Sequence, residues 1–357
     1  MGYRVAQWAT GHVGMHALRS IILHPDLELV GLWVHGADKV GRDAGEICGL
    51  GPVGVIATSD PGEILGLRPD CVSYMATGDL RPQEAVDDMA RILASGANLV
   101  GTSVVPLVYP PSAPAPWVEQ LTAACDSGGT SCFVSGIDPG FANDLLPIVL
   151  SGFCQRIDSV RMMEVLNYAT YDQAEVLFDT MGFGRPLDHE PLLLWPGSLT
   201  FAWGGVIRSI ADALDVSLDG IEEWHERRAA DETFEISTGT IEKGTTAGLR
   251  FEVRGVVGGV PRIILEHVTR LHDDVAPEWP QPTGQGGYRV VIEGSPNYTL
   301  DFQMLGEDGD HNTAGVLGTA MRVLNAIPFV CDAPPGLLSV LDLPVVPGRH
   351  LMTDRTP

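Results

Sequence analysis

The stretch that decides the fold is Tyr3-Arg-Val-Ala-Gln-Trp-Ala-Thr-Gly-His-Val-Gly14, which runs on into Met15-His-Ala-Leu-Arg-Ser-Ile-Ile-Leu23. An apolar run, then Gly11 and Gly14, then apolar residues at helical spacing predict a strand, a tight turn and a helix. Glycine suits this turn because the backbone must bend sharply and offer N–H groups to a phosphate at the positive end of a helix. The stretch therefore predicts the start of a dinucleotide-binding fold, although Ala9 stands where the full pattern has glycine.

The residues expected to contact the dinucleotide follow the predicted parallel strands. In an open parallel sheet, the loops at the carboxyl ends of the strands face the ligand crevice. The expected contacts are Thr10, Gly11, His12, Val13 and Gly14 in the turn, His35, Lys39 and Arg42 after the second strand, Ala76 and Thr77 after the strand 70–75, and Asn143 after the strand 130–135. Two alternatives stay open: the glycines only close a strand onto a helix, and Asn143 only begins a helix.

The end of the second strand, 27–35, decides the expected cofactor. An NAD-preferring site places Asp or Glu about 20 residues past the glycine turn, where it holds the ribose hydroxyls. Here the residues are Val34-His-Gly-Ala37, with Lys39 and Arg42 beyond. Without the acid, a 2′-phosphate meets no repulsion, so the sequence favours NADP over NAD, which remains an alternative. Lys39 and Arg42 also fit an ordinary solvated loop.

Composition excludes several classes of protein. The 357 residues (38.2 kDa) carry a net charge of −24 and a pI near 4.6, which repels nucleic acid and acidic membrane surfaces. The six cysteines show no paired spacing, which is typical of reduced thiols in a cytoplasmic protein. No leader and no apolar run of membrane-spanning length is expected. The histidines lack metal-ligand spacing, so no metal site is expected.

Strands and helices alternate through residues 1–142, which predicts a Rossmann domain with a doubly wound parallel sheet. Within it, the proline-rich stretch 105–116 is expected to form a loop without helix. From 143 to 310 the strands alternate apolar and polar residues, which predicts an α+β domain with a mixed or antiparallel sheet. Residues 311–357 are expected to form a helix and a tail that return to the first domain.

Four segments together carry a resemblance to a known family: the turn 8–14, Gly41-Arg-Asp-Ala-Gly-Glu-Ile-Cys-Gly49, Gly136-Ile-Asp-Pro-Gly-Phe141 and Met181-Gly-Phe-Gly-Arg-Pro186. The chain resembles the dihydrodipicolinate-reductase-like family, most of all the branch of 2,4-diaminopentanoate dehydrogenase and the native NAD(P)H-dependent amine dehydrogenases. The resemblance implies a Rossmann domain, a second domain with the substrate pocket and a homodimer interface, and hydride transfer between NADPH and a carbonyl or imine carbon.

One position departs from the family. The amine-forming branch has a glutamate in a Thr-x-Glu context after the fifth strand, where it binds ammonia or the amine. Alignment of Gly101-Thr-Ser-Val-Val-Pro106 on that pattern puts Val104 at this position. The nearest substitutes are Asp138, which also fits an Asp-Pro turn that caps a helix, and Glu164, which also fits a buried ion pair. The resemblance therefore leaves open which acid, if any, moves the protons.

The expected substrate pocket is an apolar crevice between the two domains. A phenol near the hydride acceptor is a competent proton donor, so Tyr168 joins Glu164 and Asp138 as a catalytic candidate. The pocket residues are Val104, Val105, Phe141, Tyr168 and Tyr171. This wall predicts a small hydrophobic substrate and an NADPH-dependent oxidoreductase acting on a C=N or C=O bond, with reductive amination as one form. A ketone or alcohol oxidoreductase, an imine reductase that uses no ammonia, and a non-catalytic NADP-binding sensor remain alternatives.

Overall fold

The computed structural model describes residues 2–78 and 81–352, which form two compact units. The first unit comprises Met1–Ile137 and Val316–Pro357, and the second comprises Asp138–Gly315. The sequence had placed these boundaries at residues 142 and 310. The observed division puts Asp138 and Phe141 in the second unit together with Glu164, so the catalytic candidates share one unit.

The first unit is built on a seven-stranded parallel sheet with the strand order β15-β6-β5-β4-β1-β2-β3. This order confirms the Rossmann prediction. Its elements are β1 (Tyr3–Trp8), α1 (His12–Leu23), β2 (Leu27–Trp33), α2 (Ala44–Ile47), β3 (Ala57–Thr58), α3 (Pro61–Gly66), β4 (Cys71–Tyr74), α4 (Pro82–Ala94), β5 (Asn98–Gly101), η1 (Val105–Val108), η2 (Pro110–Ser112), α5 (Ala115–Gly128), β6 (Ser131–Val134), α9 (Ile327–Cys331) and β15 (Gly336–Leu338), with most of α8 (His311–Leu324).

One local prediction in this unit is wrong. The proline-rich stretch forms the 3₁₀ turns η1 and η2, and α5 already begins at Ala115, because proline is tolerated in the first turn of a helix. The predicted tail includes an edge strand, because its residues Gly336–Leu338 pair in parallel with β6. Residues 353–357 of the predicted tail lie outside the described residues.

One stretch does reach the length and hydropathy of a membrane span, contrary to expectation. It covers His311–Cys331, which contains α8 and α9, with a mean hydropathy of 1.5. Its side chains Val323, Leu324, Ile327 and Val330 are fully buried in the core of the first unit. Burial of this kind is typical of a core helix in a globular protein.

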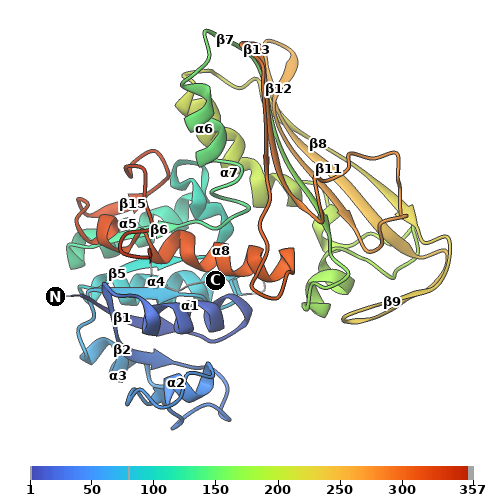
Figure 1. Cartoon of the computed structure of the whole chain (residues 1–357). Helices are drawn as coiled ribbons and strands as arrows, with labels where there is room; N and C mark the ends of the chain where they lie inside the picture. Colours follow the sequence, from blue (N-terminus) through green and yellow to red (C-terminus); the bar gives the residue numbers. More distant parts are fainter. Residues whose placement is uncertain (1, 79–80, 353–357) are drawn as a thin grey trace. The chain divides into compact units, whose positions relative to one another are not determined.

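The second unit is built on a six-stranded mixed sheet with the order β14-β13-β7-β12-β11-β8, in which only the β7–β12 pair is parallel. The predicted mixed sheet is confirmed, and Figure 1 shows its long strands running side by side. Its elements are α6 (Leu145–Ser151), β7 (Arg156–Asn167), η3 (Glu175–Thr180), η4 (Leu192–Leu194), α7 (Ser198–Ala213), β8 (Gly220–Ala229), β9 (Phe234–Ile236), β10 (Gly239–Ile241), β11 (Thr246–Val257), β12 (Val260–Arg270), β13 (Gly287–Ser295) and β14 (Tyr298–Phe302).

The two faces of this sheet differ in chemistry because side chains alternate along each strand. The face that packs on α7 holds apolar residues such as Leu249, Phe251 and Val253, all fully buried. The opposite face holds Arg250 and Glu252, which take part in a network of ion pairs. Any polar side chain on the α7 face therefore sits in an apolar layer, where it needs a partner.

Candidate functional site

The glycine turn of the first unit has the geometry of a dinucleotide-binding turn. Ala9 adopts φ +74°, the left-handed conformation that favours glycine, and its carbonyl accepts a 2.8 Å hydrogen bond from Gln7 Nε2. A Cβ on Gly14 would lie 2.4 Å from the Ala9 carbonyl oxygen, so helix and strand approach too closely for any side chain there. The fold thus places Ala9 in the conformation that the missing glycine would supply.

Gly11 is different, because nothing in the fold requires it to be glycine. It precedes α1 with φ −74°, an ordinary value, and a Cβ there would meet no atom within 4 Å. What glycine does provide at this position is room for a ligand at the amino end of α1, where the backbone N–H groups have no helical partner. The turn therefore fits a nicotinamide dinucleotide, with His12, Val13 and Gly14 forming the first turn of α1.

The loop after β2 lies against this turn. Because β2 ends at Trp33, the residues that follow are Val34, which is buried, and His35, which is exposed. Lys39 Nζ donates to the carbonyl oxygen and the hydroxyl of Thr10, at 3.1 and 3.0 Å. Arg42 is exposed. Lys39 is thus held beside the glycine turn, whereas the structure gives Arg42 no such placement.

The remaining first-unit residues cluster around the end of β5. Ala76 accepts a hydrogen bond through its carbonyl from the Ser103 hydroxyl, and Thr77 is exposed next to it. Val104 is buried in the left-handed region, at φ 60° and ψ 62°. A β-branched residue is strained in that conformation. Val105 opens η1, so both valines belong to the first unit.

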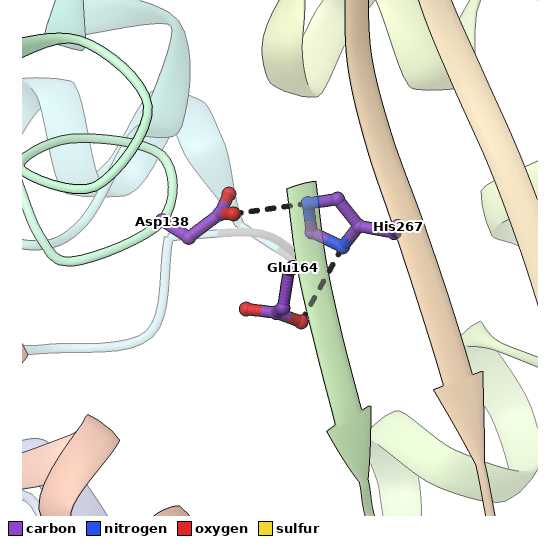
Figure 2. Close-up of side chains that lie close together, drawn as sticks. All are labelled: Asp138, Glu164 and His267. Carbon is purple, nitrogen blue, oxygen red and sulfur yellow. Dashed lines mark ion pairs between the residues drawn. The ribbon is translucent and has the colours of Figure 1, made fainter. Parts of the chain in front are cut away.

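In the second unit, two of the predicted residues meet a third side chain. Figure 2 shows Asp138 and Glu164 each facing a different nitrogen of the His267 ring. Asp138 Oδ2 lies 3.1 Å from His267 Nε2, and Glu164 Oε1 lies 3.4 Å from His267 Nδ1. The three side chains are only 3, 5 and 6% exposed. We call Asp138, Glu164 and His267 the acid–histidine cluster.

Register explains why these residues are neighbours. Glu164 on β7 pairs directly with His267 on the parallel strand β12 and with Tyr288 on the antiparallel strand β13. Residues opposite one another in a ladder share a face of the sheet. Phe251 continues the row on β11, with its ring stacked 4.6 Å from that of His267. Glu164 and His267 therefore lie in one cross-strand row on the α7 face, and Asp138 meets this row from the segment that precedes α6.

Hydrogen bonds from neighbouring side chains fix both carboxylates. The Tyr168 hydroxyl donates to Glu164 Oε1 at 2.8 Å, and the Tyr288 hydroxyl is a second hydrogen-bond partner of this carboxyl group. Trp203 on α7 donates its indole N–H to Asp138 Oδ1 at 2.7 Å. Asp138 is thus tied to the cluster, and the helix α6 is capped instead by Asp144.

Burial shifts the proton affinities of the cluster. Burial raises the pKa of Glu164 to about 7, although the charge of His267 and the two tyrosine hydroxyls oppose the shift. Burial alone lowers the pKa of His267, but Asp138 and Glu164 more than offset it, so that pKa is raised. Burial also raises the pKa of the Tyr168 hydroxyl well above its usual value. Glu164 is therefore a carboxyl group that exchanges a proton near neutral pH.

The other pocket residues predicted in the second unit, Tyr171 and Phe141, pack on aromatic rings near the cluster. Tyr171 stacks on Tyr168 with ring centroids 4.7 Å apart. Phe141 packs on Phe302 at 6.0 Å, and Phe302 in turn packs on Tyr288 at 6.2 Å. These rings give Glu164 an aromatic surrounding, and a substrate pocket at this place stays a prediction.

Asn143, predicted to contact the cofactor, is buried in a turn. Its side-chain oxygen accepts a 2.9 Å hydrogen bond from the Gly140 N–H, so it holds the turn that precedes α6. Its side-chain nitrogen has no partner in the part of the chain that the structure describes. The position in a turn agrees with the structural alternative, and a cofactor contact stays a prediction.

The sequence did not single out His267, Tyr288 or Trp203. These residues are 21 to 150 positions away from Asp138, Glu164 and each other along the chain, and the expectation of no metal site rested on such spacing. In space, however, Asp138, Glu164 and His267 each offer one ligand atom within 4.8 Å of the others. Only the strand register could have found them, since it pairs Glu164 with both His267 and Tyr288.

Comparisons with known proteins agree with this architecture. Residues 141–356 match the model of the 2,4-diaminopentanoate dehydrogenase C-terminal domain. The chain is 45% identical to an amine dehydrogenase of Streptomyces virginiae over 96% of both chains, and 26% identical to a 2,4-diaminopentanoate dehydrogenase of Acetoanaerobium sticklandii over 82% of this chain and 80% of that one. The structure of an amine dehydrogenase from Mycobacterium smegmatis superposes with a TM-score of 0.77 at 22% identity, covering 97% of each chain, which shows the shared fold.

With the Rossmann order of strands and the glycine turn, the likeness to dehydrogenases over nearly the whole chain makes it an NAD(P)-dependent oxidoreductase. The chain belongs to the family of amine dehydrogenases and 2,4-diaminopentanoate dehydrogenases.

Proposed function

We propose that the chain is an NADPH-dependent amine dehydrogenase that interconverts a small hydrophobic amine and the corresponding C=N compound. The observation that carries the proposal is the buried carboxyl group of Glu164, hydrogen-bonded to the Tyr168 hydroxyl in an aromatic surrounding. We infer that these two residues move protons in place of the glutamate that Val104 replaces. The 45% identity to an amine dehydrogenase supports the same reaction class.

The chemistry of the C=N bond favours an acidic site. An amine binds as an ammonium cation and must lose one proton before hydride can leave the neighbouring carbon. A nicotinamide cofactor, when bound, would supply the acceptor for that hydride, and the amine would become a positively charged iminium. A carboxylate behind the Tyr168 phenol accepts the first proton and stabilises the positive charge in a site of low dielectric. A neutral ketone or alcohol gains less from this arrangement.

A substrate panel tests the proposal against its alternatives. Purified protein is mixed with NADP⁺ and either primary amines or matched secondary alcohols, and the absorbance of reduced cofactor is followed. We expect turnover with hydrophobic primary amines and the reverse reaction with ketone, ammonia and NADPH. Turnover with alcohols alone would support the ketone or alcohol oxidoreductase that Val104 suggests. Tight NADPH binding without turnover on either panel would support a cofactor sensor.

NADP is our proposed cofactor over NAD. The support is the absence of a carboxylate directly after β2, where Val34 and His35 stand, and the placement of Lys39 beside Thr10 of the glycine turn. A cation there attracts a phosphate group. We expect Lys39→Met to weaken NADPH binding about 10-fold or more while NADH binding changes little. Lys243→Met, which removes an exposed lysine of the second unit, is the matched control. Equal weakening of both cofactors by Lys39→Met would contradict the proposed preference.

We also propose a homodimer in the cytoplasm. The polar face of the mixed sheet offers both signs of charge, with Arg161, Arg250 and Arg254 only 31, 23 and 28% exposed around the buried carboxylates of Glu252 and Glu266. A face that carries both charges can pair with a second copy of itself about a two-fold axis. Sedimentation equilibrium should therefore give twice the chain mass of 38.2 kDa. Six cysteines without disulfides support the cytoplasmic location.

A further inference from the structure

We propose that His267 is a positioning residue that shares protons with Asp138 and Glu164 and thereby sets the pH at which Glu164 changes charge. The inference rests on the proposed acid–base role of Glu164. It begins with the ring itself, whose two nitrogens face two different carboxylates, at 3.1 Å for Asp138 and 3.4 Å for Glu164 (Figure 2). A neutral imidazole carries one N–H, whereas an imidazolium carries two. Only the charged ring offers a proton to both acids.

The contacts of His267 with Asp138 and Glu164 are those of charged groups buried together. The Nε2 atom lies close to Asp138 yet lacks the alignment of a hydrogen bond. Within residues 2–78 and 81–352, His267 is the ion-pair partner of both carboxylates, and no lysine or arginine pairs with either. Two neighbouring carboxylates cannot both ionise in a buried site without a cation. The charge of the ring therefore decides whether Glu164 ionises.

The rest of the surroundings holds this arrangement in place. Trp203 on α7 bonds Asp138 and lies edge-on to the His267 ring at 4.8 Å, while Phe251 on β11 stacks on its other side. The titratable groups that face the His267 ring are Asp138 and Glu164, and beside them Tyr168 and Tyr288. Glu266, next to His267 on β12, points to the opposite face and pairs with Arg161 and Arg250. Packing fixes the His267 ring in place. Its charge therefore changes only when it gains or loses a proton.

A proton path follows from the same contacts. A proton taken from a bound ammonium passes to the Tyr168–Glu164 pair, and Glu164 becomes neutral as it receives it. The ring can then take that proton from Glu164 and pass its other proton to Asp138. The cluster holds one proton more than before the transfer, and this internal exchange leaves that total unchanged. His267 touches neither substrate nor cofactor in this scheme, and acts through Glu164.

The test compares His267→Gln with His225→Gln. His225 is the matched control because it lies in the same cross-strand row, opposite Phe251 on β8, but is exposed and far along the row from the carboxylates. The pH dependence of kcat/KM for amine oxidation is measured for both variants and the wild type. In the wild type we expect kcat/KM to rise with pH through a midpoint near pH 7. In His267→Gln this midpoint should move upward by about one pH unit or more, because Glu164 loses the cation that favours its charged form. His225→Gln should leave it in place.

A second readout does not depend on turnover. Histidine ring signals are followed by NMR as a function of pH in the full chain, with the His267 signal identified from the variant. We expect His267 to titrate above the usual range of histidine and to move downward by about one unit in Asp138→Asn, which also covers the case in which His267→Gln does not fold.

The outcomes separate this inference from the proposed function. The shared proton would be overturned by either of two results. One is a pH midpoint of kcat/KM that does not move in His267→Gln, and the other is a His267 titration that does not change in Asp138→Asn. If the His267 titration moves in Asp138→Asn but kcat/KM shows no rise with pH near 7, the shared proton would be upheld and the role of Glu164 overturned. Stoichiometric metal in the purified protein, with activity lost to a chelator and restored by the metal, would overturn the inference in favour of a metal site.

Discussion

Gly14→Ala should abolish measurable cofactor binding and lower the free energy of unfolding by about 1 to 3 kcal/mol. The added Cβ would lie 2.4 Å from the Ala9 carbonyl oxygen, a backbone atom that cannot rotate away. Either α1 moves off β1 or the Gln7–Ala9 hydrogen bond breaks, and Ala17, Leu18 and Ile21 on α1 are all fully buried. Both changes displace the N–H groups that meet the phosphate.

Gly11→Ala is the matched control, because the same Cβ is added three residues earlier in open space. Two small effects on stability oppose each other there, a poorer residue before the helix and a less flexible unfolded chain. We expect the free energy of unfolding to stay within about 1 kcal/mol of wild type. Cofactor affinity should nevertheless fall about 10-fold or more, since the methyl group occupies the approach to the amino end of α1.

Two measurements on each variant decide the matter: urea unfolding without cofactor, and titration with NADPH. The structure predicts that stability and binding fall together in Gly14→Ala and separate in Gly11→Ala. A Gly11→Ala protein that binds NADPH like wild type would show that the dinucleotide does not approach the chain at this turn. Full stability in Gly14→Ala would show instead that the turn relaxes easily.

This pair also shows how far local patterns predict structure. The glycine turn and the strand and helix alternation follow from residues close in sequence, and the Rossmann order of strands confirms them. The sequence treated Ala9 as a defect in the pattern. In the structure, Ala9 takes the glycine conformation at φ +74°, held by hydrogen bonds from Gln7 to its carbonyl and from its N–H to the Trp33 carbonyl. Tertiary contacts thus override a local preference.

The acid–histidine cluster lies beyond local patterns. Glu164 was a candidate because it is one of the nearest acids by sequence that could replace the glutamate missing at Val104, and Tyr168 because a phenol just beyond it can donate a proton. His267 is 103 positions from Glu164 and becomes its neighbour only through the parallel β7–β12 register. A one-residue slip of that register would turn His267 to the opposite face. Periodicity identifies strands and buried faces, but the pairing of distant strands requires the fold itself.

Glu164→Gln should lower kcat for amine oxidation about 100-fold or more while the protein remains folded. The amide keeps the size of the side chain and one acceptor oxygen for the Tyr168 hydroxyl, but it cannot accept a proton near neutral pH. Binding of NADPH should persist, because the glycine turn belongs to the first unit. Asp301→Asn, on the second unit's β14 and paired with Arg289, is a matched amide substitution that should leave kcat unchanged.

The pH dependence gives the sharper result. With its pKa raised to about 7, Glu164 is protonated below that pH and ionised above it. Amine oxidation needs the ionised form to accept a proton, so kcat/KM of the wild type should rise through pH 7, and this rise should be missing in Glu164→Gln. The substrate's own ionisation is the same for both proteins and cancels in their ratio. A rise of equal size in both would assign the limb to another group.

Stability should respond to pH in the opposite direction from activity. A carboxyl group with a raised pKa in the folded state contributes stability below its unfolded pKa and loses it as pH increases through the folded value. The raised pKa of His267 acts in the same direction, since that stabilisation too is lost as pH increases. The free energy of unfolding of the wild type should therefore fall between pH 5 and 8 relative to Glu164→Gln, as measured by urea unfolding at several pH values. The buried carboxyl group would then destabilise the folded protein at the pH where it accepts protons. This pattern is expected of a functional carboxyl group and not of a structural ion pair.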